Sequence, residues 1–108
     1  MEQYTTVLTA DSSEEFCTGL CSTLQRAGGF QILGTAGDGE QAIRMVMDKK
    51  PDILVLDLML SKMDGISVLK AIDRMERKPV TLATSGFVTD YVANATANLG
   101  VRYLMLKP

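Results

Sequence analysis

The stretch Ile53-Leu54-Val55-Leu56-Asp57 decides the fold of this chain. Its four aliphatic residues form a run that is too short for a buried helix. Such a run is typical of a central parallel strand that is buried on both faces. Asp57 follows directly, so the strand delivers one carboxylate to its carboxyl end, the edge at which sheets of this kind bind ligands.

Polar residues follow three further apolar runs in the same way. They are Asp11 after residues 6–10, Thr84 after residues 80–83 and Lys107 after residues 103–106. Because the carboxyl ends of parallel strands meet at one edge of a sheet, we expect these side chains to converge with Asp57 on one pocket. The set suits an aspartate that accepts a phosphoryl group beside a divalent cation.

Strands and helices alternate along the whole sequence. A second strand is predicted over residues 30–36, and apolar positions at helical spacing predict helices over about residues 12–27, 38–50, 66–72 and 89–99. The pair Ser12 and Glu15 has the spacing of a capping box, which predicts the start of the first helix. Short connections and right-handed crossovers then favour an α/β fold, a flavodoxin-like doubly wound five-stranded parallel sheet with strand order 2-1-3-4-5.

The chain stops two residues after its fifth predicted strand, before any fifth helix. One face of the sheet would then be covered by the first helix alone, and the rest of that face would be an exposed apolar patch. We therefore expect residues 1–108 to be one domain and the N-terminal part of a longer protein.

Composition excludes several classes of function. The formal charge of −2 and the pI of about 5.0 argue against direct nucleic-acid binding. No apolar run approaches the roughly 20 residues needed to span a bilayer, and no signal peptide is visible, so we expect a cytoplasmic protein without membrane contact. Cys17 and Cys21 are interpreted as small buried thiols, because the sequence has no histidine and no further cysteine to complete a zinc site.

Five motifs in order resemble the receiver domain of bacterial two-component response regulators. They are Ala10-Asp11, Leu54-Val55-Leu56-Asp57, Met63-Asp64-Gly65, Thr84 and Leu106-Lys107-Pro108. The resemblance covers the whole chain. Within the family, the segment of residues 34–42 and the Met-Asp-Gly loop are most similar to regulators of the sporulation-initiation type.

The resemblance implies a role for each matched residue. Asp57 would accept a phosphoryl group from a histidine kinase or phosphotransferase, and Thr84 and Lys107 would contact the phosphoryl oxygens. Mg²⁺ would be held by Asp11, Asp57 and the backbone carbonyl of Met59. The domain would be a switch and not an enzyme in its own right. It would control an effector beyond residue 108, expected to bind DNA in transcription regulation, and a homodimer is a further expected partner state.

The sequence departs from the family pattern at three positions. Ser12 stands where receivers usually carry a second acid, which predicts weaker Mg²⁺ binding. Ser61 replaces a usual proline, and Leu104 occupies the place of a switching aromatic residue, with Tyr103 next to it on the opposite face of the strand.

Other functions remain open. A pseudo-receiver that is not phosphorylated and acts as a protein interaction module is the alternative, supported by Ser12. A haloacid-dehalogenase-like enzyme is disfavoured, because Met59 stands where that chemistry needs an acid. A flavin-binding flavodoxin is also disfavoured, because residues 11–14 are too acidic to bind a phosphate group.

Overall fold

The computed structural model describes residues 3–60 and 63–107. These residues form strands and helices in strict alternation. The elements are β1 (Thr5–Ala10), α1 (Glu14–Ala27), β2 (Phe30–Ala36), α2 (Gly39–Lys49), β3 (Ile53–Asp57), α3 (Gly65–Asp73), β4 (Val80–Ser85), α4 (Asp90–Asn98) and β5 (Tyr103–Leu106). None of the described helices is long and apolar enough to cross a membrane.

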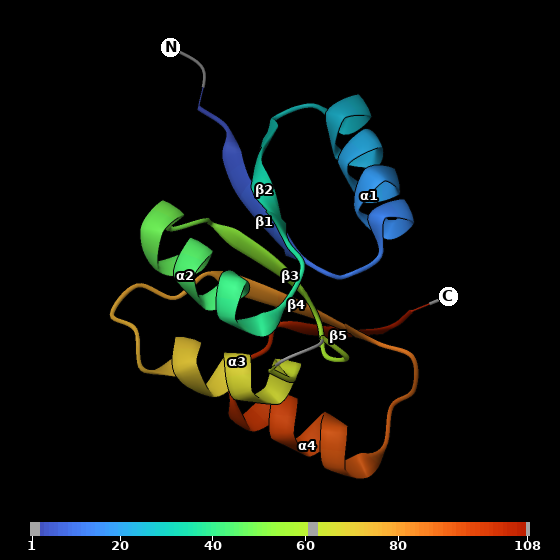
Figure 1. Ribbon diagram of the computed structural model, residues 1–108, viewed down its shortest axis with the longest axis vertical. Coiled ribbons are helices and arrows are strands. Elements are labelled where there is room, and N and C mark those ends of the chain that lie inside the picture. The colour runs from blue at the N-terminus through green and yellow to red at the C-terminus, as the bar shows by residue number, and fades with distance from the viewer. Residues whose placement is uncertain (1–2, 61–62, 108) are drawn as a thin grey trace.

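The strands form one parallel sheet in the order β2-β1-β3-β4-β5 (Figure 1). The predicted fold is therefore confirmed, and β3, which ends at Asp57, lies at its centre. Helix α1 packs against β2 on one side of the sheet, while α2, α3 and α4 lie on the other side. All four helices begin at the carboxyl edge of the sheet, because each follows a strand through a short loop.

The main core lies between the sheet and the layer of α2, α3 and α4. Alternate residues of the strands form the sheet side of this core, among them Leu54 and Leu56 of β3 and Ala83 of β4. Side chains alternate between the faces of a strand, so Asp57, Thr84 and Lys107 belong to the other face, which α1 covers in part. On that face of β5, Tyr103 and Met105 are exposed.

Three local predictions need correction. The N-cap of α1 is Ser13 and not Ser12: the Ser13 hydroxyl accepts from the Phe16 amide, and the Ser13 amide donates to Asp11. Strand β4 runs to Ser85 and not to residue 83, because the amides of Leu58 and Lys107 bond to the carbonyls of Thr84 and Ser85. Of the two thiols only Cys17 is buried, and Cys21 is half-buried.

Candidate phosphoacceptor site

Asp57 is a buried carboxylate at the last position of the central strand. Its exposed fraction is 6%. The Met59 amide donates to Oδ1 at 2.9 Å, and Oδ2 lies 3.3 Å from the ammonium of Lys107. The hydrogen bond from the Met59 amide turns the Asp57 carboxylate past the end of β3, towards the loop that follows.

Asp11 is the second buried carboxylate of the site. Its Oδ1 accepts a hydrogen bond from the Ser13 amide at 2.8 Å, and its Oδ2 lies 2.7 Å from the Lys107 ammonium. Asp11 therefore fixes the start of α1, and it shares the Lys107 ammonium with Asp57.

Lys107 joins the two carboxylates, so the structure brings together three of the four residues predicted to converge. Burial of its ammonium lowers the pKa of Lys107, but the hydrogen bonds and negative charges of Asp11 and Asp57 outweigh this effect and raise the pKa overall. The ammonium also lies 4.8 Å from the centroid of the Phe16 ring. One cation thus faces two carboxylates, which leaves the site with an excess of negative charge.

Thr84 lies beside Asp57 but does not bond to it. The two residues are partners across the β3–β4 ladder, and their side chains share one face of the sheet. The Thr84 hydroxyl is buried and has no hydrogen-bond partner among the residues that the structure describes. An unpaired buried hydroxyl is costly, so it is available to a group that enters the site.

Ser85 lies next to Thr84 but faces away from the site. It occupies the last position of β4, and its buried hydroxyl donates to the Phe87 carbonyl at 2.6 Å. Because side chains alternate along a strand, Ser85 shares the face of Ala83, whereas Thr84 shares the face of Asp57.

Met59 and Gly86 lie at the rim of the site. Met59 contributes its amide to Asp57, while its side chain is 58% exposed. The predicted contact of its carbonyl with a metal stays a prediction. A side chain at Gly86 would point into open space, since a Cβ added there would have no described atom within 4 Å.

The donor set fits a small divalent cation. Asp11 and Asp57 are two buried carboxylates that both contact the Lys107 ammonium. Mg²⁺ is commonly held by one or two carboxylates, with water completing its coordination shell. Among the described residues, no group of three or more His, Cys, Asp or Glu side chains is arranged to hold a metal. Ser12 is exposed and brings no charge, so the site offers a minimal set of ligands.

The Met63-Asp64-Gly65 motif supports the loop behind Asp57. Asp64 caps α3 by accepting from the Ser67 amide at 2.9 Å. A Cβ at Gly65 would lie 2.5 Å from the Leu58 Cα and 3.2 Å from the Asp57 carbonyl oxygen. Only glycine lets the start of α3 pack this closely against the end of β3.

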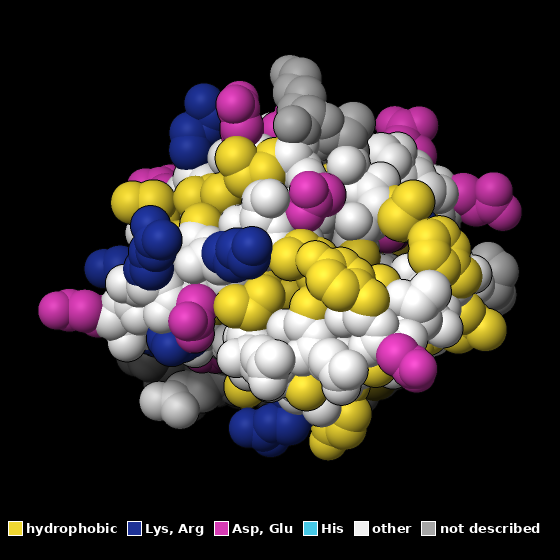
Figure 2. All heavy atoms as spheres, turned by 90° about the horizontal axis from the view of Figure 1, so that it is seen from below, with side chains coloured by type: hydrophobic (Ala, Val, Ile, Leu, Met, Phe, Trp, Pro, Cys, Tyr) yellow, Lys and Arg dark blue, Asp and Glu magenta, His cyan; other side chains and the backbone are white. Residues whose placement is uncertain are grey.

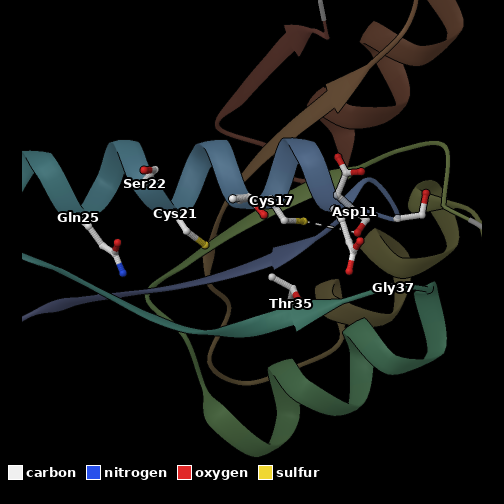
Figure 3. Close-up of a pocket in the computed structure, with 10 residues that line it drawn as sticks. Asp11, Cys17, Cys21, Ser22, Gln25, Thr35 and Gly37 are labelled. Carbon is white, nitrogen blue, oxygen red and sulfur yellow. Dashed lines mark hydrogen bonds between the residues drawn. The ribbon is translucent and has the colours of Figure 1, made fainter.

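A cavity of about 510 Å³ adjoins the site between α1 and β2 (Figure 3). Cys17, Cys21 and Gln25 project into it from α1, opposite Thr35 of β2. Burial, followed by the charge of Asp11, raises the pKa of the Cys17 thiol, which keeps it protonated and unreactive at neutral pH. Its Sγ donates weakly to the Asp11 carbonyl at 3.6 Å, so Cys17 supports the loop and adds no chemistry.

The described residues thus form a doubly wound parallel α/β domain whose strand ends join two aspartates and a lysine. Residues 7–108 match the family model described as the response regulator receiver domain. The chain belongs to this family.

Solved structures of similar proteins agree with this assignment. The receiver domain of NarL from Mycobacterium tuberculosis is 24% identical with a TM-score of 0.89, over 96% of this chain and 84% of that one. A chain of the CheX-CheY-BeF3-Mg²⁺ complex from Borrelia burgdorferi is 28% identical with a TM-score of 0.83, over 95% and 78%. A LuxR-family DNA-binding regulator from Staphylococcus aureus is 19% identical with a TM-score of 0.87, over 94% and 85%. These likenesses do not support the narrower sporulation-initiation type.

Proposed function

We propose that this domain is a phosphorylation-dependent switch that accepts a phosphoryl group on Asp57. The observation that carries the proposal is the buried Asp57 carboxylate, held between the Met59 amide and the Lys107 ammonium at the carboxyl edge of the sheet. The donor is a phosphohistidine on a kinase or phosphotransferase. An Asp57 oxygen attacks the phosphorus, the P–N bond breaks, and the product is an acyl phosphate.

The residues around Asp57 have distinct parts in this reaction. Lys107 pairs with the phosphoryl oxygens as a point charge, and the Thr84 hydroxyl donates to one of them. Asp11 and Asp57, with the Met59 carbonyl, would hold Mg²⁺, which supplies charge neutralisation for the transferring group. In support, the similar Borrelia burgdorferi complex is described with Mg²⁺.

The output of the switch is control of an effector. New negative charge at Asp57 would draw Lys107 and a strand-end hydroxyl, and this would bias the arrangement of β5 and of α4 next to it. A similar regulator is described as DNA-binding, which supports a transcriptional effector, and a homodimer would be a second route to output. The sporulation-initiation type stays a prediction from the sequence.

Labelling with a small phosphodonor tests the proposal. Acetyl phosphate with Mg²⁺ should add one phosphate to the wild-type protein, detected by intact-mass spectrometry, and Asp57→Asn should abolish the addition. Asp64→Asn, which alters an acid outside the buried pair, is the matched control and should still be labelled. Labelling that persists in Asp57→Asn would overturn the assignment.

The alternative is a pseudo-receiver that binds partners without being phosphorylated. The exposed Ser12, which leaves only two carboxylates at the site, is the observation in its favour. If the wild-type protein takes up no phosphate at saturating Mg²⁺ and still binds a partner, this alternative holds.

A further inference from the structure

We propose that Phe16 is a positioning residue that holds the Lys107 ammonium over the phosphoacceptor site. This inference rests on the proposed function of Asp57 and Lys107. The carrying observation is the distance of 4.8 Å between the Lys107 Nζ and the centroid of the Phe16 ring, within the range of a cation–π interaction.

The ring is tied to the site through the start of α1. Asp11 accepts from the Ser13 amide through Oδ1, and the Ser13 hydroxyl accepts from the Phe16 amide at 3.2 Å. The Phe16 ring faces Lys107, and the Lys107 ammonium donates to Oδ2 of Asp11 at 2.7 Å. This closed circuit of contacts places an aromatic face beside the ammonium.

The ring adds a third contact to the two carboxylates that hold the Lys107 ammonium. A lysine side chain loses about 2 kcal/mol of rotamer entropy when it is fixed, and the neighbouring Met105 and Leu106 of the edge strand β5 are exposed. Both of its carboxylate partners are also the predicted metal ligands. The ring attracts the ammonium without using a carboxylate lone pair, so its hold does not compete with a metal.

The side of Lys107 that faces α1 is open. A groove of about 550 Å³ lies there, lined by Phe16, Gly19, Leu20 and Lys107. On this side the Phe16 ring is the contact that limits movement of the ammonium away from the two carboxylates. Phe16 therefore acts on the direction of Lys107, and not on the packing of the main core, to which it does not belong.

Fluorinated phenylalanines at position 16 test this role, because each added fluorine weakens the ring's attraction for a cation with little change in size. The full chain carrying mono-, di- or trifluorophenylalanine should show a stepwise rise in the mobility of the Lys107 side chain, followed by NMR relaxation of its Nζ group. The rate of Asp57 labelling should fall in the same order, by about 2- to 30-fold in total. Phe16→Leu should resemble the trifluoro protein, and Phe16→Tyr should restore the wild-type values.

Fluorination of Phe30, at the start of β2, is the matched control and should change neither quantity. A flat response of both quantities across the position-16 series would overturn the proposal, as would a Phe16→Leu protein with wild-type Lys107 mobility and labelling. The mobility is measured on unphosphorylated protein. If the mobility responds while Asp57→Asn is labelled like wild type, the proposed function fails and the contact between Phe16 and Lys107 stands.

Discussion

At the scale of single residues, two adjacent hydroxyls end β4. Thr84 faces the same side of the sheet as Asp57 and lacks a described partner, whereas Ser85 faces the opposite side and is bonded to Phe87. The direction of the two side chains therefore favours Thr84 as the donor to a phosphoryl group on Asp57.

We expect Thr84→Val to slow Asp57 labelling by acetyl phosphate roughly tenfold, the size of one lost hydrogen bond to a charged group. Ser85→Ala should leave the rate nearly unchanged. Thr84→Val should also raise the free energy of unfolding by about 1 kcal/mol, because an unpaired buried hydroxyl is removed. Rates from mass spectrometry and urea unfolding curves give both quantities. A large loss of rate in Ser85→Ala alone would contradict the assignment of this role to Thr84.

The lifetime of the phosphorylated state also depends on single residues. Hydrolysis of an acyl phosphate needs a water molecule that is oriented towards the phosphorus. Met59 and Gly86 lie at the rim of the site, and neither a thioether nor a glycine can orient or activate this water. The Met59 side chain is exposed and Gly86 has open space beside it, so both sites accept polar groups without steric cost.

The double variant Met59→Asn with Gly86→Glu should lose phosphate faster than wild type, by up to roughly 10²-fold. Decay is followed by intact-mass spectrometry after removal of the phosphodonor. Met47→Asn, an equally exposed methionine on α2, is the control and should decay like wild type. A wild-type half-life of seconds that the double variant does not shorten would exclude water positioning at these two residues.

At the scale of elements, the contact between α3 and the end of β3 depends on one glycine. A methyl group at Gly65 meets the Leu58 backbone and crowds the Asp57 carbonyl, whereas a methyl group at Gly19, in the middle of α1, would have no described atom within 4 Å. The same substitution should therefore have opposite effects at the two positions.

Gly65→Ala should lower the free energy of unfolding by about 1–3 kcal/mol through overpacking, and slow labelling of Asp57 as its strand end shifts. Gly19→Ala should raise the stability by about 0.5–1 kcal/mol, because alanine loses less conformational entropy in a helix. Thermal and urea melts of both proteins test the pair. Equal stabilities of Gly65→Ala and wild type would show that α3 moves away without cost.

Most elements could be predicted from the sequence because their apolar runs have clear periods and clear ends. The errors lie where two neighbouring residues have equal propensity. Either Ser12 or Ser13 can cap a helix, and the bond from the Ser13 amide to Asp11 decides between them. Thr84 and Ser85 extend β4 because β3 and the segment after β5 supply partners for their carbonyls. The role of Phe16 depends on a residue 91 positions away, which helical spacing alone does not reveal.

At the scale of the whole molecule, charge is unevenly distributed along the strand direction. Acidic residues gather at the carboxyl edge, where the helices begin: Asp11, Glu14, Glu15, Asp38, Glu40, Asp57, Asp64 and Asp90. Apart from Lys62, which lies outside the described residues, Lys107 is the sole Lys or Arg in the strand-to-helix loops, in the first helical turns and in the described chain after β5. Acids at helix starts favour the helix dipoles, and together they surround the site with negative potential.

The α4 side of the molecule differs from this edge. Figure 2 views this side and shows hydrophobic side chains gathered near its middle, with Lys and Arg on one flank. Exposed hydrophobic residues of α4 and of the loop before it are Phe87, Val88 and Tyr91. The carboxyl edge and the α4 side are therefore chemically different surfaces: a charged edge and an apolar side.

The acidic edge predicts opposite salt effects for two kinds of phosphodonor. Acetyl phosphate is an anion, so at saturating Mg²⁺ its reaction with Asp57 should become faster as added KCl screens the repulsion. A phosphotransferase with a basic docking surface should react more slowly under the same conditions, because screening within a Debye length of about 8–10 Å removes its attraction. Neutralising Glu14, Glu15 and Glu40 as glutamines should flatten both dependences while leaving the buried site intact. Rates that do not change with salt, in wild type and in this variant, would show that the acids serve helix capping alone.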